Sequence, residues 1–131
     1  MFAQSTRMMG DYDRAAALFT ESLELNRLIG DPGMVAVELH NLGHVEMHRS
    51  NVDAAESRFA ECARAASTDD PYDVSMTDLN HASVSFARGD PVGAAELLHR
   101  AVSGLEDNGM EPAPDDAFEI GWLRDRLDGP G

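Results

Sequence analysis

Three histidines follow one another at one-turn spacing in the segment HNLGHVEMHR, as His40, His44 and His48. On a helix, residues i and i+4 lie about 6 Å apart along the axis and can share a metal ion. His40 and His48 are about 12 Å apart along that axis, too far to ligate the same zinc through bonds of roughly 2 Å. A site would therefore need a histidine pair plus ligands from another helix. We favour a polar helix face without a metal-binding role and keep a metal site and a pH-responsive surface as alternatives.

Other residues with reactive side chains do not form a catalytic pattern. The chain has no Ser-His-Asp order, no phosphate-binding loop and no HExxH or CxxC motif. Glu46 falls among apolar residues of its helix, and we expect it to pair with Arg49 or Arg58. We expect His81 to be a hydrogen-bonded interior histidine and Cys62 to serve packing. The sequence predicts a non-enzymatic protein without a cofactor.

Composition restricts the classes of partner. The chain has 131 residues, enough for one domain, and its 24 acidic and 10 basic residues give a formal net charge of −14. Such a charge repels phosphate backbones and anionic membrane surfaces, so nucleic acid and membrane are not expected partners. We expect no secretory signal and no membrane span. The single cysteine cannot form an internal disulfide, which favours a cytoplasmic protein.

The elements that position these side chains repeat along the chain. GDYDRAAALF from Gly10, SNVDAAESRF from Ser50 and GDPVGAAELL from Gly89 align without gaps, at spacings of 40 and 39 residues. Helical periodicity dominates, and Asp-Pro pairs at residues 31–32, 70–71 and 90–91 combine an N-cap with a proline that suits the first helical position. Asp11 and Asn51 can cap the helices that follow them. The expected helices cover residues 2–9, 12–29, 34–49, 52–66, 72–88, 91–107 and 115–127.

Small and large residues recur at fixed places in each period. They are Gly10, Ala15 and Phe19 in the first unit, Leu42, Gly43, Ala55 and Phe59 in the second, and Ala82, Gly89, Ala94, Leu98 and Ala101 in the third. A small residue lets two helix backbones approach, and a large one fills the space beside them. This pattern resembles the tetratricopeptide repeat (TPR), in a long-helix variant similar to repeats of actinobacterial transcriptional regulators. The resemblance implies an all-α, right-handed α-solenoid of antiparallel helix hairpins over residues 1–107, in units of about 1–30, 34–67 and 72–107.

The resemblance also implies a function, because the concave face of such solenoids binds peptides. We therefore expect a protein or peptide partner with apolar anchors and some basic character, and we expect this chain to belong to a bacterial regulatory protein. A clamp for a terminal carboxylate is not expected, because the chain has no lysine and only Arg7 supplies a basic groove position. The implied groove residues are Val37, His40, Asn41, His44, Met47, His48, Met76, Leu79, Asn80, Ser83 and Phe86.

The two ends of the chain depart from the repeat. Residues 108–114 form a Pro/Gly linker, and residues 115–128 an amphipathic helix that we expect to cap the third unit, or to dock Phe118 and Trp122 in a groove. The first unit begins near the middle of its first helix. We keep three explanations for this short first helix: a shortened parent protein, a misplaced start, or pairing of this end with another chain. Uncovered Phe2, Met8 and Met9 make a homodimer an alternative function.

Overall fold

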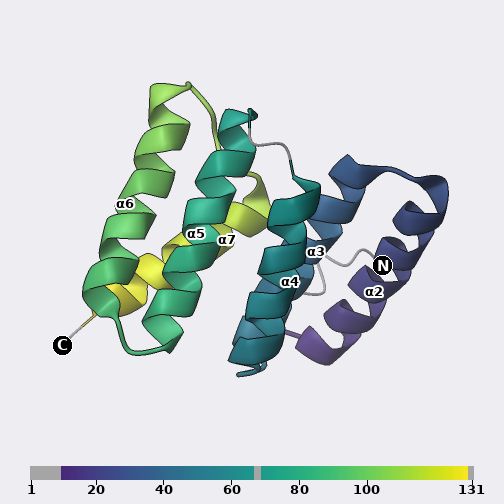
Figure 1. Ribbon diagram of the computed structural model, residues 1–131. Coiled ribbons are helices and arrows are strands. Elements are labelled where there is room, and N and C mark those ends of the chain that lie inside the picture. Colours follow the sequence, from purple (N-terminus) through teal and green to yellow (C-terminus); the bar gives the residue numbers. More distant parts are fainter. Residues whose placement is uncertain (1–9, 67–68, 130–131) are drawn as a thin grey trace. The chain divides into compact units, whose positions relative to one another are not determined.

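The computed structural model describes residues 10–66 and 69–129, and all regular structure within them is α-helical. The described helices are α2 (Tyr12–Ile29), α3 (Pro32–His48), α4 (Val52–Ala65), α5 (Pro71–Ala87), α6 (Pro91–Asp107) and α7 (Pro114–Leu127) (Figure 1). The all-α class is confirmed, and each of these helices begins and ends within two residues of its expected range. The helix expected at residues 2–9 lies outside the described residues, as do Phe2, Met8 and Met9.

Local capping explains where most helices begin. Asp31, Asp70 and Asp90 are the N-caps of α3, α5 and α6, and each carboxylate accepts a hydrogen bond from a backbone N–H of the first turn, at 2.9–3.1 Å. A proline follows each cap, where no intrahelical N–H bond is lost. Asp11 caps α2 in the same way.

The turn between α3 and α4 departs from the expected capping. Asn51 occupies the N-cap position of α4, but its side chain makes no capping bond, so that expectation is wrong. Its Nδ2 donates instead to Glu46 Oε2 at 3.1 Å. Glu46 Oε1 accepts from Arg49 Nη1 at 2.8 Å, which confirms the expected pairing of Glu46 with an arginine. Ser50 has φ 64°, in the left-handed region where glycine is favoured.

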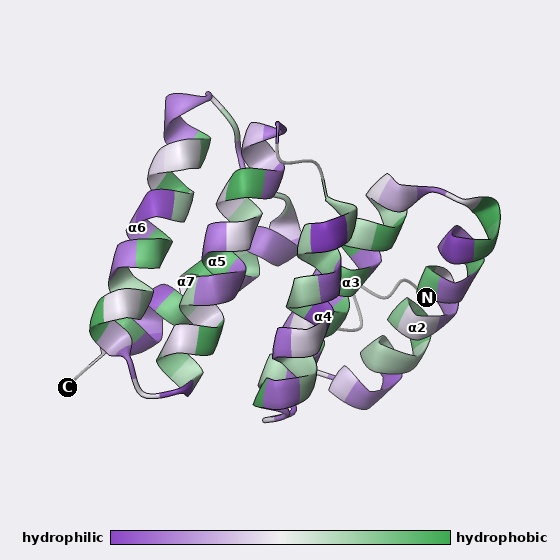
Figure 2. Cartoon of the chain, in the orientation of Figure 1, coloured by the Kyte–Doolittle hydropathy of each residue, from purple (hydrophilic) through white to green (hydrophobic). Residues whose placement is uncertain are grey.

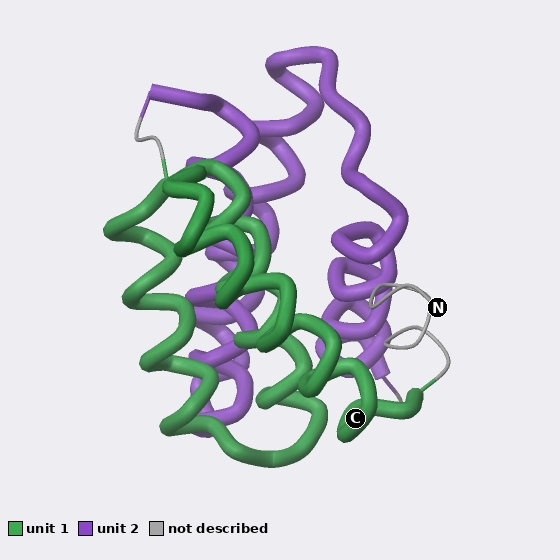
Figure 3. Tube along the Cα trace, turned by 90° about the vertical axis from the view of Figure 1, so that its right-hand side faces the viewer, with its two compact units in different colours: residues 1–67 green, residues 68–131 purple. Residues whose placement is uncertain are grey.

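The chain divides into two compact units, residues 1–67 and residues 68–131 (Figure 3). In the first unit α3 packs on both α2 and α4. Its core is formed by apolar side chains from all three helices, with the thiol of Cys62 donating a hydrogen bond to the carbonyl of Ala36 at 3.3 Å. The buried core residues are Ala15, Phe19, Leu23, Ala36, Leu39, Leu42, Val45 and Cys62.

A glycine allows α3 and α4 to approach closely in this unit. A Cβ at Gly43 would lie 2.8 Å from Phe59 Cζ and nearer still to two other carbons of that ring. Phe59 is 5% exposed, and Ala55, one turn earlier on α4, is fully buried. The small and large residues that the sequence pairs for repeat packing therefore meet in the α3–α4 interface.

In the second unit α5 packs along α6, and α7 runs obliquely across the pair (Figure 1). Ile120 and Leu123 of α7 join a core of α5 and α6 side chains, so this helix covers apolar residues of α5 and α6. Ala82, Ala94 and Leu98, which the sequence assigned to repeat packing, are buried. The other buried members of this core are Met76, Leu79, Ala101 and Leu105.

Figure 2 shows hydrophobic and hydrophilic residues alternating along the helices, as expected when one face packs and another meets water. None of the helices in the described ranges combines the length and the apolar character that crossing a membrane requires.

Candidate functional site

His44 and His48 of α3 contact the helices on either side of it in the first unit, and His40 packs against His44. The His44 ring is fully buried and lies edge-on to Phe59 of α4, with ring centroids 5.0 Å apart. His40 packs against His44 at 4.9 Å. His48 stacks on Tyr12 of α2 at 4.8 Å, with ring planes 9° apart.

These contacts correct the expected position of His44. The resemblance implies a groove position for His44, whereas its burial and its contact with Phe59 put it in the α3–α4 interface. A helix that packs on two neighbours buries a wider arc than one that packs on a single neighbour. The spacing of His44 along the helix therefore does not by itself show whether its side chain is exposed.

The other residues expected in the groove lie on α3 of the first unit and α5 of the second. Met76 and Leu79 belong to the core of the second unit, so their side chains serve packing there. Val37 is exposed, whereas Asn41, Asn80 and Ser83 are buried and Met47 and Phe86 are partly exposed. Contact of these residues with a partner stays a prediction.

His81 was expected in the interior, and that expectation is wrong. It is exposed on α5, between the buried residues Asn80 and Ala82. A metal site was an alternative for the histidine stripe. Residues 10–66 and 69–129 contain no cluster of three or more His, Cys, Asp and Glu side chains able to hold an ion.

Glu38 is a buried acid that the sequence analysis did not single out. It is 6% exposed on α3, and its Oε2 has no hydrogen-bond partner among the described residues. Burial raises the pKa of this carboxyl above its usual value, because desolvation disfavours the charged form. The fold is therefore more stable when this carboxyl is protonated than when it is ionised.

Tyr72 connects α5 to the start of α7, a contact between residues far apart in sequence. Its hydroxyl donates to Asp116 Oδ2 at 2.6 Å and accepts from the backbone N–H of Ala113 at 2.8 Å. Burial and the hydrogen bond to Asp116 both raise the pKa of Tyr72. The neutral hydroxyl therefore fixes the N-terminus of α7, which has no side-chain cap of its own.

Trp122 is held within the second unit. Its ring lies edge-on to Phe86 of α5, with centroids 6.3 Å apart, and the guanidinium of Arg126 lies 3.7 Å above it. The tryptophan thus packs on its own unit against Phe86, a residue expected in the groove, and both capping and docking of the last helix predict this contact.

A trough lies between α6 and α7 in the second unit. It consists of two hollows of about 370 and 210 Å³ that share Val102 and Arg124 as lining residues. The larger hollow continues under the linker before α7. Its apolar lining is Val102, Leu105, Met110, Pro112, Ala117 and Ile120, and its charged lining is Glu106, Glu111 and Arg124. The smaller adds Ala95, Leu98, His99, Leu127 and Asp128.

The chain matches no protein-family model, no curated protein and no solved structure. The resemblance to tetratricopeptide repeats therefore depends on the residues quoted above, and function has to be argued from the surfaces of the two units.

Proposed function

We propose that this protein is a non-enzymatic helical-repeat module, of the TPR type, that binds a peptide or a segment of another protein. Two observations support the repeat: antiparallel packing of α3 with α4 and of α5 with α6, and the close approach of Gly43 to Phe59. We infer that these hairpins belong to a right-handed solenoid. The module would act in the cytoplasm, as part of a bacterial regulatory protein.

The observation that carries the binding proposal is the trough between α6 and α7. Its lining is largely apolar, with carboxylates of Glu106 and Glu111 and the guanidinium of Arg124 along it. Such a surface suits apolar anchor side chains of a peptide, while polar groups at the rim fix its register. The excess of acidic residues favours peptides that carry basic side chains.

Gly121 allows the trough to be filled without disturbing the fold. It lines the larger hollow from α7, and a Cβ at this position would meet nothing within 4 Å. Gly121→Leu therefore adds a side chain to the trough and also favours the helix, since leucine is the better helix former. Ala60→Leu is the matched control, because Ala60 is an exposed residue of α4 in the other unit.

The test selects peptides that bind the wild-type protein from a displayed random library and measures their affinity by fluorescence anisotropy. We expect selected peptides to carry apolar and basic residues and to bind Gly121→Leu about tenfold more weakly, while Ala60→Leu binds as wild type does. Failure to select any peptide would contradict the binding function. Peptides that bind both variants equally would remove the trough as the site.

A further inference from the structure

One face of α2 carries exposed apolar side chains. Leu25, Leu28 and Ile29 are 54%, 84% and 75% exposed. The opposite face of α2 packs in the core through Phe19. Leu28 follows Phe19 by nine residues, which is about 180° around a helix at 100° per residue. Leu28 therefore points away from the core of the first unit.

The other two repeats have small or polar residues at the same places. With the repeats aligned from Gly10, Ser50 and Gly89, the counterparts of Leu25, Leu28 and Ile29 are Ala65, Thr68 and Asp69 in the second unit and Gly104, Asp107 and Asn108 in the third. The repeat pattern thus does not require large apolar residues here. Large apolar side chains gathered on one exposed face mark an interaction surface.

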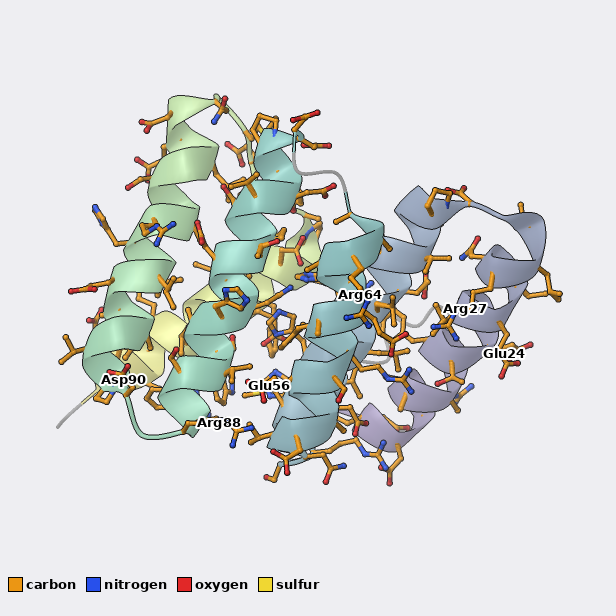
Figure 4. The ribbon with its side chains drawn as sticks, viewed as in Figure 1. Glu24, Arg27, Glu56, Arg64, Arg88 and Asp90 are labelled. Carbon is orange, nitrogen blue, oxygen red and sulfur yellow. The ribbon has the colours of Figure 1, made fainter. Side chains whose placement is uncertain are left out.

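Acidic side chains accompany these apolar ones. Glu21 and Glu24 lie one turn before Leu25 and Leu28 on α2, and both are exposed. Arg27 does not offset their charge, because its Nη2 pairs with Glu61 Oε2 of α4 at 2.9 Å. In Figure 4 Glu24 projects to the outer side of α2, whereas Arg27 points inward.

We propose that this outer face of α2 binds an amphipathic helix of another protein whose apolar stripe is flanked by lysine or arginine. Leu25, Leu28 and Ile29 have the i, i+3, i+4 spacing that forms the ridges of a helix–helix contact. Glu21 and Glu24 lie where basic residues beside the stripe would pair with them. A second copy of this chain is a poorer occupant, because two chains of net charge −14 repel each other.

The probe is a synthetic Leu/Lys peptide designed as an amphipathic helix, compared with its Leu/Glu counterpart, both measured by anisotropy and circular dichroism. The test variant Leu25→Ala/Leu28→Asp/Ile29→Asn introduces residues that the other repeats carry. Because all three side chains are exposed, we expect it to fold. Binding of the Leu/Lys peptide should weaken at least about tenfold, and Glu21→Gln/Glu24→Gln should weaken it severalfold. The Leu/Glu peptide should not bind.

Val92→Ser is the control, because Val92 is 71% exposed on α6 of the other unit and its loss removes apolar surface elsewhere. Wild-type affinity of the triple α2 variant, or equal binding of the two peptides, would overturn the inference. So would concentration-dependent dimers in light scattering that the triple variant abolishes, since a second copy would then occupy the face. The inference is independent of the trough, and Gly121→Leu should bind the Leu/Lys peptide as wild type does.

Discussion

Replacing Gly43 with alanine tests the contact between α3 and α4 on which the repeat interpretation depends. Alanine is the better helix former by about 1 kcal/mol, so an unhindered Gly→Ala change within a helix stabilises it. At residue 43 the new Cβ would lie 2.8 Å from Phe59 Cζ and closer to two other ring carbons, whereas carbon atoms normally pack at about 3.5–4.0 Å. The ring or the helix must therefore move by about 1 Å.

Such a movement is costly here because Phe59 is 5% exposed and the buried ring of His44 lies against it, at 5.0 Å between centroids. Overpacking of this kind costs about 1–3 kcal/mol, and the upper end applies where neighbours cannot give way. After the gain in helix propensity, we expect a net loss of about 1–2 kcal/mol in the free energy of unfolding. The midpoint of thermal unfolding should fall by roughly 4–8 °C.

Gly121→Ala is the matched control for this prediction. Its Cβ would meet nothing within 4 Å, so only the propensity term remains and the midpoint should rise by roughly 4 °C. Thermal and urea unfolding followed by circular dichroism measure both changes. Adding Phe59→Leu to Gly43→Ala should recover part of the loss, as expected for two residues in contact. If Gly43→Ala stabilised the protein as much as Gly121→Ala does, the helices would not approach at this glycine and the reasoning would be refuted.

Three further changes test single contacts. Glu38→Gln should raise the midpoint of thermal unfolding near pH 7 and leave it unchanged near pH 4. A raised pKa in the folded state makes stability fall as the pH rises from the usual pKa of glutamate through the pKa in the folded protein. A difference between variant and wild type that stays constant across this pH range would contradict this. Tyr72→Phe should cost about 1–3 kcal/mol and expose the amides at the start of α7 to hydrogen exchange, because buried Asp116 and the N–H of Ala113 both lose their hydrogen bond to the Tyr72 hydroxyl. Unchanged exchange at these amides would disprove the connection. Ser50→Gly should raise the free energy of unfolding, measured in urea, by about 1 kcal/mol, because glycine adopts the positive φ of this residue without strain. A loss of stability would show that the contacts of the serine side chain contribute more than the positive φ costs.

The extent of each helix could be predicted because helix ends depend on residues a few positions apart. Asp31, Asp70 and Asp90 each cap a first turn through a backbone N–H two or three residues ahead. Asn51 failed as a cap because Glu46, five residues earlier, offered its carboxylate across the turn. That competition depends on how the turn folds, and the sequence does not show it.

The candidate site could be predicted only in part, because burial depends on how many neighbours a helix has. The sequence named the histidine stripe on α3, but the position of His44 against Phe59 follows from α3 packing on two helices at once. His81 shows the opposite error, because it is exposed although the sequence predicted an interior histidine. The trough was not predicted at all, because it forms only where α7 crosses α6.

By itself, the sequence determined the all-helical class, the approximate helix ends and the assignment of small and large residues such as Gly43 and Phe59 to packing positions, since periodicity, capping and side-chain size are properties of short segments. Only the tertiary structure decided which polar groups are buried. The Tyr72–Asp116 hydrogen bond joins residues 44 positions apart, and the exposure of Leu28 depends on what covers α2. Contacts of this kind depend on the packing of whole helices, which no local pattern of residues specifies.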